Sequence, residues 1–139
     1  MGGLDVKLRT YQIATRERDQ MVEVTHQVRE AVRESGVQDG YAIVYCPHTT
    51  AGIAINENAD PDVVRDVLRR LDELYPWEHP KDRHAEGNTA AHMKAIQTGT
   101  SQMVLVQDSR LVLGTWQGVY FCEFDGPRTR QFHVKTIAG

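Results

Sequence analysis

The chain has 139 residues, with 16 Lys and Arg against 19 Asp and Glu, which gives a formal net charge of −3. This length suits one domain with one core, so residues 1–139 are expected to form a single domain. A slightly acidic chain lacks the clustered Lys and Arg that nucleic-acid phosphates need, which argues against a nucleic-acid partner. Charged residues interrupt the first ten positions, and no later segment is long and apolar enough for a membrane span. We therefore expect a cytoplasmic protein with no membrane partner.

Two cysteines are present, and they lie far apart in sequence. Cys46 and Cys122 each stand inside an apolar run that predicts a strand, and they do not form a Cys-x-x-Cys pair. Buried free thiols in a reducing compartment are expected at both positions.

The first half of the chain predicts strands that alternate with helices. Residues 4–13 alternate apolar and polar side chains, as in a half-buried strand. A helix is expected to open at Asp19 and to end at Gly36, because glycine readily adopts the left-handed conformation of a helix C-terminus. Two short apolar runs, residues 41–46 and 52–55, then predict a pair of strands separated by a polar segment.

A second helix has strong signals at both of its ends. Asp60 is a favourable N-cap, and Pro61 fits the first helical position because a missing N–H has no cost there. Pro76 is expected to end the helix. The apolar residues that repeat at helical spacing predict a buried face made of Val63, Val64, Val67, Leu68, Leu71 and Leu74.

The second half of the chain predicts a loop, a short helix and a group of strands. Residues 77–88 are polar, and Asn88 or Thr89 is expected to cap a helix that runs to about Gln97. Turn residues then separate the strands that are expected at 102–107, 110–124 and 130–136. This order of elements predicts an α+β fold with a largely antiparallel sheet or sandwich and two to three helices.

Three histidines stand where predicted elements begin or end: His48, His84 and His92. Neutral imidazole binds zinc-like ions, and three such ligands with an open fourth position form a catalytic site. A shared metal or acid/base site is therefore the leading hypothesis. On spacing alone, an equal alternative is that each histidine caps a helix or bonds a backbone carbonyl. His79 and His133 lack such a setting, so structural or surface roles are expected for them.

Glu57 is the first candidate for an acid or base beside these histidines. It follows an apolar strand, a position from which its carboxylate could reach back to His48 and orient water or move a proton. The alternative is a solvated acid at a strand end or a cap for the next helix. Glu86, between two of the proposed metal ligands, ranks second, and Glu123 ranks third.

Several residues are candidates for binding an anionic substrate. Thr49 and Thr50 offer hydroxyl donors next to His48, although the segment is not a phosphate loop of the Walker type. Arg128 and Arg130 could bind one phosphate group through both guanidinium groups. The alternative for the two arginines is a pair of exposed charges at the end of a strand.

Trp116 and Gln117 lie between Gly114 and Gly118, where the backbone can approach another chain or a ligand. Both residues are therefore candidates for lining a pocket. A core or interface position is the alternative for Trp116.

A set of short segments resembles the YjbQ family in content and in order. These segments are His48-Thr49-Thr50-Ala51, Asn56-Glu57-Asn58-Ala59-Asp60-Pro61, Arg83-His84-x-Glu86-Gly87, His92, Leu113-Gly114-Thr115-Trp116-Gln117-Gly118 and Asp125-Gly126-Pro127-Arg128. The resemblance covers nearly the whole chain and includes all three of the histidines at element ends. One departure is the turn at residues 108–110, Asp-Ser-Arg, where relatives commonly have glycine.

The resemblance implies a compact α+β domain, association as a homotrimer and a polar site around the histidines. Relatives are often named secondary thiamine-phosphate synthase, which implies a transferase. Asn56, Trp116 and Gln117 are then expected to bind substrate, and the glycine-flanked strand of Trp116 is expected to lie at the trimer interface.

The leading functional hypothesis is a metal-dependent enzyme that acts on a phosphorylated small molecule and resembles thiamine-phosphate synthase. His48, His84 and His92 would hold the divalent metal ion. A zinc-like ion suits three imidazoles, whereas displacement of pyrophosphate favours magnesium and oxygen ligands. Two alternatives stay open: a metal-dependent hydrolase of a phosphorylated or ester substrate, and a non-catalytic trimer that binds a metal or an anion.

Overall fold

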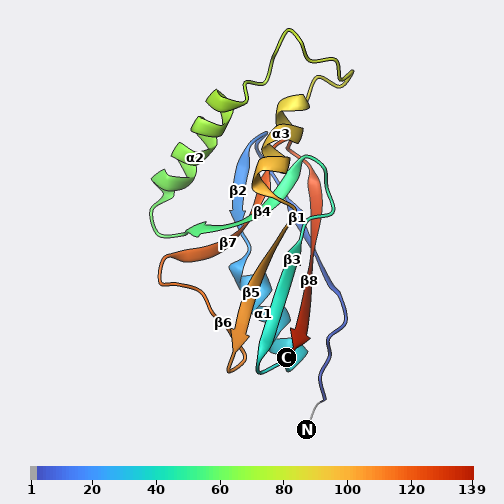
Figure 1. The fold of residues 1–139 in the computed structure, drawn as a ribbon, viewed down its shortest axis with the longest axis vertical. Coiled ribbons are helices and arrows are strands. Elements are labelled where there is room, and N and C mark those ends of the chain that lie inside the picture. Colours follow the sequence, from blue (N-terminus) through green and yellow to red (C-terminus); the bar gives the residue numbers. More distant parts are fainter. Residues whose placement is uncertain (1–2) are drawn as a thin grey trace.

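A computed structural model describes residues 3–139, which form three helices and eight strands (Figure 1). The strands are β1 (Arg9–Ala14), β2 (Gln20–Glu23), β3 (Gly40–Tyr45), β4 (Ala51–Glu57), β5 (Ser101–Gln107), β6 (Arg110–Leu111), β7 (Gln117–Glu123) and β8 (Thr129–Ala138). The helices are α1 (Thr25–Ser35), α2 (Pro61–Leu74) and α3 (Thr89–Thr98). One sheet has the order β1-β8-β3-β5-β6 and the other β2-β7-β4, with every pair antiparallel. The predicted α+β fold with antiparallel sheets is confirmed.

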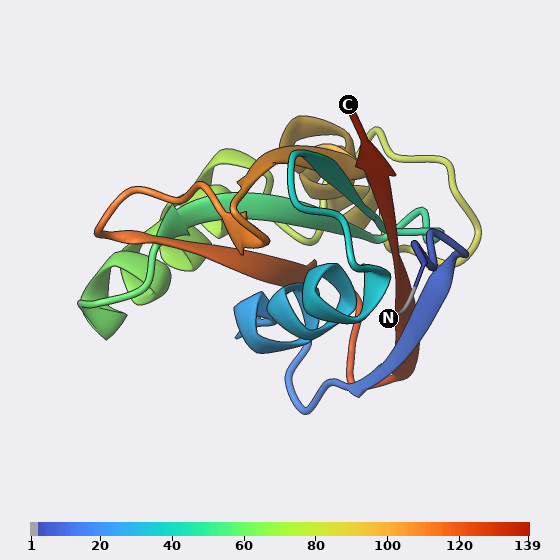
Figure 2. The ribbon, with the colours of Figure 1, turned by 90° about the horizontal axis from the view of Figure 1, so that it is seen from below.

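The main core lies between the two sheets and includes one face of α1. Phe132 of the first sheet and Phe121 of the second are fully buried, with ring centroids 6.2 Å apart. Val28 and Val32 of α1 join the same cluster, and Figure 2 shows α1 beside β7 and β8. Burial of each such side chain stabilises the fold by about 1.5–3 kcal/mol.

A second apolar cluster covers the other face of the β2-β7-β4 sheet. Tyr120, Cys122 and Phe124 pack there with Ala91 and Ala95 of α3. Strand β7 is therefore buried on both faces, which explains why its sequence is a continuous apolar run instead of an alternating one.

Small residues let α3 lie close to β4. The buried side chains of the helix are Ala90, Ala91, Lys94 and Ala95. On the facing strand, a Cβ at Gly52 would lie 2.5 Å from the carbonyl oxygen of Gly99, which follows the helix. Only glycine leaves room for this approach. The contact holds α3, and with it His92, against the strand that begins just after His48.

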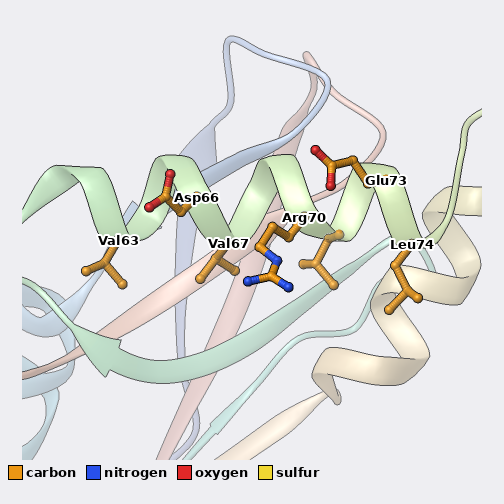
Figure 3. A pocket seen from close by; sticks show the side chains of 7 residues that line it. Val63, Asp66, Val67, Arg70, Glu73 and Leu74 are labelled. Carbon is orange, nitrogen blue, oxygen red and sulfur yellow. The ribbon is translucent and has the colours of Figure 1, made fainter.

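Helix α2 lies at the edge of the molecule and buries none of its residues (Figure 1). Val64 and Leu71 are half-buried against the second cluster, whereas Val67 and Leu74 are 38% and 65% exposed. Figure 3 shows Val63, Val67 and Leu74 on one side of the helix, where they line an open cavity of about 660 Å³. The predicted buried face is therefore only half-buried, and the prediction is wrong for Val67 and Leu74, which are exposed in the single chain. Periodicity predicts that a face is apolar, but it does not show what covers that face.

Ion pairs tie α2 to the rest of the molecule. Lys94 of α3 is fully buried, and its Nζ lies 3.0 Å from Oδ1 of Asp19 and 2.9 Å from Oδ1 of Asp72. Arg18 also pairs with Asp72, at 2.8 Å, and its guanidinium lies 4.5 Å from the ring centre of Trp77. This network joins α2, α3 and the connection between β1 and β2.

Three predicted elements differ from the structure. The first strand begins at Arg9 instead of residue 4. The segment expected to open a helix at Asp19 forms β2, which pairs with β7, and α1 begins at Thr25. The single strand expected over 110–124 is two strands, β6 and β7, in different sheets. Local sequence patterns do not predict these strand bounds and pairings, because strand formation depends on pairing with distant segments.

Several local predictions are confirmed. Gly36 ends α1 in the left-handed conformation, with φ 74°. Pro61 is the first residue of α2, and Oδ1 of Asp60 accepts a hydrogen bond from the N–H of Asp62 at 2.9 Å. Within residues 3–139, no helix is long and apolar enough to cross a membrane.

Candidate functional site

The three histidines singled out by the sequence line one cavity of about 410 Å³. His48 comes from the β3–β4 connection, His84 from the loop between α2 and α3, and His92 from the first turn of α3. The other lining residues are Pro47, Thr49, Thr50, Glu86, Asn88, Asp125, Arg128 and Arg130. The fold thus brings the three histidine segments and residues 125–130 to one polar cavity.

His48 is held by the backbone of β8 through one ring nitrogen. Its Nε2 lies 3.1 Å from the carbonyl oxygen and 3.0 Å from the backbone nitrogen of Gln131. Burial, followed by the nearby charge of Arg130, lowers the pKa of His48, so the imidazole is neutral at pH 7. Nε2 either donates to the Gln131 carbonyl or accepts from the Gln131 N–H, and in the tautomer in which Nε2 donates, Nδ1 carries the lone pair that a metal ion needs.

His84 and His92 form an edge-to-face pair with ring centroids 5.4 Å apart and planes at 85°. Nε2 of His84 also lies 3.9 Å from Oε1 of Glu86. In the part of the chain that the structure describes, no three His, Cys, Asp or Glu side chains are placed to hold a metal ion together. The histidines therefore share a cavity without forming a preassembled three-ligand site.

Asn88 supplies an unpaired acceptor among the lining residues. It is buried, its Nδ2 donates to Oδ2 of Asp125 at 2.8 Å, and its Oδ1 has no hydrogen-bond partner among residues 3–139. An unpaired buried oxygen costs about 1–3 kcal/mol, so a cation or a ligand donor is favoured beside it. Sequence analysis assigned Asn88 only as a helix cap, and its side chain does not cap α3. A capping asparagine and a ligand-binding one have the same sequence signature.

The donor set of the cavity fits a divalent ion. Imidazole nitrogens suit zinc-like ions, and the unpaired Oδ1 of Asn88 and the carboxylate of Glu86 are further oxygen donors. His84, His92 and Nδ1 of His48 could hold such an ion once their side chains close on it.

Both arginines of the predicted phosphate site are paired with acids of the protein. Buried Arg130 donates through Nε to Oε1 of Glu123 at 2.8 Å and through Nη2 to the other carboxylate oxygen. Nη2 of Arg128 lies 2.7 Å from Oδ2 of Asp125. Burial opposes the ionisation of Glu123, but hydrogen bonds from Arg130, the Asp125 N–H and Thr15 outweigh it and lower the Glu123 pKa. Glu123 is thus an ionised partner of Arg130, which lines the cavity.

The two threonines beside His48 differ in accessibility. Thr50 is buried, and its Oγ1 accepts a hydrogen bond from Nη2 of Arg130 at 2.8 Å. Thr49 is exposed at the rim of the cavity. Thr49 is therefore the hydroxyl of the pair that a ligand reaches more easily.

The cysteines are buried and free, as predicted. Burial is the main cause that raises the pKa of Cys46 to about 11 and that of Cys122 to about 12. Both thiols are therefore protonated at pH 7 and are poor nucleophiles.

Asn56 and Glu57 lie at the far end of β4 from the histidines. The strand has 7 residues, a length of roughly 20 Å, so the carboxylate of Glu57 does not reach His48 in the same chain. Its Oε2 accepts instead from the N–H of Asp60 at 3.2 Å. Gln117 of β7 is opposite Glu57 in the register and lies at the same distant end.

The glycines around Trp116 do allow a close approach, but by residues of the same chain. A Cβ at Gly118 would lie 2.7 Å from Oε2 of Glu23 and 2.9 Å from Asn58. Trp116 is 63% exposed, and Oε1 of Gln117 accepts from the backbone N–H three residues earlier, at 2.8 Å. Neither side chain lines the histidine cavity.

Comparison with known proteins places this chain in a family. Residues 9–139 match the family model described as UPF0047 protein YjbQ-like. The chain belongs to this YjbQ family. It is 62% identical over 130 residues to UPF0047 protein YugU of Bacillus subtilis, a match that covers 94% of this chain and 98% of YugU. A UPF0047 protein of Methanocaldococcus jannaschii is 50% identical over 129 residues, with 91% of each chain covered.

Solved structures of YjbQ-like proteins have the same fold. A YjbQ/UPF0047 protein from Clostridium acetobutylicum is 53% identical and has a TM-score of 0.91, with 93% of this chain and 99% of that chain covered. A YbjQ-like protein from Sulfolobus solfataricus is 28% identical and has a TM-score of 0.92, with 99% and 100% covered. The family and the fold that the sequence motifs implied are both confirmed.

Proposed function

We propose that the histidine cavity is the active site of a metal-dependent enzyme that acts on a phosphorylated small molecule. The observation that carries this proposal is the convergence of three imidazoles on one open cavity of about 410 Å³, with Glu86 and Asn88 among its other lining residues. A volume in this range suits a small-molecule ligand. Polar side chains presented by loops around such a cavity serve binding more often than packing.

His84, His92 and Nδ1 of His48 are the proposed metal ligands. The contact between Nε2 of His48 and the carbonyl oxygen of Gln131 supports this assignment. A metal-binding histidine commonly donates its second ring nitrogen to a backbone carbonyl, which orients the ring. When bound, a divalent ion supplies charge neutralisation at a phosphoryl group. The ion is needed because Asp125 and Glu123 already neutralise the two arginines of the cavity.

Two reactions fit these groups. In a transfer of the thiamine-phosphate synthase type, a thiazole nitrogen attacks the pyrimidine methylene carbon. A C–N bond forms, the C–O bond breaks, and its electron pair leaves with pyrophosphate. This reaction requires stabilisation of the leaving charge. Hydrolysis also requires a base that takes a proton from water, and Glu86 at the cavity is the carboxylate in place for it, because Glu57 lies too far away in the same chain.

The released product tests the proposal and separates the two reactions. Protein stripped with a chelator and reloaded with zinc or magnesium is incubated with the two thiamine precursors and with a panel of phosphate esters. Release of pyrophosphate from the precursors supports the transferase, and release of orthophosphate from an ester supports the hydrolase. His84→Ala is expected to lower either rate by about 100-fold, whereas the His133→Ala control retains it. Release of neither product above the metal-free control contradicts the enzyme.

We also propose that the protein assembles as a homotrimer. The exposed apolar face of α2 supports this assembly, and so does a second apolar surface on the outer face of the first sheet. There Tyr45, Met103 and Leu105 are 45%, 59% and 60% exposed. Two different apolar surfaces on one chain suit a head-to-tail contact, and such contacts can close into a ring.

A further inference from the structure

A second cavity, of about 470 Å³, lies at the end of the molecule opposite the histidines. In Figure 1, α1 and the β5–β6 turn are at the lower end, while α3 and the loop before it are at the upper end. The cavity is lined by Arg29, Val32, Arg33, Asp108, Ser109, Arg110 and Leu111. We propose that this cavity binds the phosphates of a small molecule that carries two or more phosphate groups, a site distinct from the proposed active site.

The charge of the cavity is not balanced by the protein. Arg29, Arg33 and Arg110 form no ion pair within residues 3–139, whereas most other arginines of the chain do. Arg29 and Arg33 are also one helical turn apart, so their charges repel each other. Asp108 is the one carboxylate among the lining residues. A multivalent anion in the cavity would relieve this repulsion.

The two glutamates Glu30 and Glu34 of α1 contact β1 and not the cavity. Glu34 pairs with Arg9, and Oε1 of Glu30 accepts a hydrogen bond from the hydroxyl of Tyr11 at 3.4 Å. Both partners belong to β1, away from the β5–β6 hairpin. The arginines of α1 that line the cavity therefore keep their charge available for a ligand.

The shape of the cavity fits a phosphorylated organic molecule. Guanidinium groups bind phosphate oxygens through paired N–H donors, and three of them can hold two phosphate groups. Leu111 is half-buried beside them, and its exposed part supplies an apolar surface for the organic part of the ligand. The volume lies in the range of small-molecule sites.

The β5–β6 turn holds its side of the cavity in a defined position. Asp108 and Ser109 have φ values of 54° and 62°, and the N–H of Ser109 donates to the carbonyl oxygen of Gln38 at 3.0 Å. Positive φ at both central residues is the geometry of a two-residue hairpin turn, and this turn fixes the position of the residue that follows it. The turn brings Arg110 opposite the arginines of α1.

Titration calorimetry with adenosine diphosphate and with inorganic pyrophosphate tests the site on the metal-free full chain. Arg29→Gln and Arg110→Gln are each expected to weaken binding by about tenfold or more, because each removes a charged hydrogen bond. All the arginines of the cavity are exposed, so these variants are expected to fold, which their unfolding midpoints check. Arg65→Gln on α2 is the control and should bind as the wild type does.

Amide chemical shifts locate the ligand independently. Shifts confined to residues 29–33 and 108–111 support the proposal, and tighter binding of the nucleotide than of pyrophosphate supports a role for the apolar surface. Equal affinities support a site for the phosphates alone. Shifts at the histidine cavity instead, affinities that the arginine variants leave unchanged, or no saturable binding would overturn the second site. None of these outcomes depends on the proposed enzyme activity, since the metal is absent.

Discussion

The ion pair of Arg130 and Glu123 stabilises the wall of the histidine cavity from inside the protein. Both side chains are buried, so a neutral partner would leave the guanidinium without a counter-charge. Glu123→Gln is therefore expected to lower the free energy of unfolding at pH 7 by about 3 kcal/mol, measured by urea titration. Glu73→Gln, which removes an exposed pair with Arg69, is the control and should change it by less than about 1 kcal/mol.

The same pair predicts how stability depends on pH. The folded-state pKa of Glu123 is lowered, so its contribution is fully present above the unfolded-state pKa of about 4.3. The contribution is lost as the pH falls from there through the folded-state pKa. The difference in unfolding free energy between wild type and Glu123→Gln should therefore shrink in acid. A difference that stays constant from pH 7 to about pH 3 would show that the charge of Glu123 contributes nothing.

His84 and His92 are expected to carry the metal. His84→Ala and His92→Ala should each weaken metal binding by about 10–100-fold or more while the protein stays folded, because neither side chain is buried. Metal content by mass spectrometry and far-ultraviolet circular dichroism measure the two effects. His133→Ala is the control, since Nδ1 of His133 lies 2.8 Å from Oγ1 of Thr10, outside the cavity. If both variants keep their full metal content, or if both unfold, the histidine cluster has a structural role and the proposed metal site is contradicted.

Among the elements, α2 is held partly by charge, because none of its side chains is fully buried. The Nζ of Lys94 joins two carboxylates, and its hydrogen bond is the main cause that lowers the pKa of Asp72. Lys94→Ala removes the buried cation and leaves Arg18 to pair with both carboxylates, so it is expected to lower the free energy of unfolding by about 1–3 kcal/mol. Hydrogen exchange should become faster in α2 and α3 before the sheets are affected. Asp66→Asn, on the exposed surface of α2, should leave the exchange pattern unchanged.

The β5–β6 turn illustrates strain within one element. Ser109 has φ 62°, a conformation that glycine adopts without a steric cost. Ser109→Gly is therefore expected to raise the free energy of unfolding by about 1 kcal/mol, measured by urea titration. Val112→Gly, three residues further along, is the comparison and should not stabilise the protein. An unchanged or lower stability for Ser109→Gly would mean that the serine side chain makes a compensating contribution.

For the whole molecule, the exposed face of α2 predicts the assembly state. Leu74→Glu places a charge on an apolar face that is 65% exposed at this residue, so it should convert a trimer to monomers without unfolding the chain. Sedimentation equilibrium at micromolar concentration measures the mass of each species. Arg65→Glu, on the polar side of α2, should remain trimeric. A wild type that is monomeric under these conditions would contradict the trimer.

The sequence by itself determined features that depend on neighbours along the chain. The Asp60-Pro61 start of α2 and the left-handed Gly36 at the end of α1 follow from local hydrogen bonds and φ preferences. Apolar periodicity was enough for the α+β class. The three histidines at element ends predicted a shared polar site, and all three line one cavity.

Only the tertiary structure decided which distant residues meet. Pairing with β7 turned the segment after Asp19 into a strand, and the length of β4 separated Glu57 from His48. Contacts between the two sheets also set the charges at the cavity, because Glu123 of β7 neutralises Arg130 of β8, and Thr50 of the β3–β4 connection accepts a hydrogen bond from the same arginine. Strand register and ion pairing join residues far apart in sequence, and no local pattern encodes such partners.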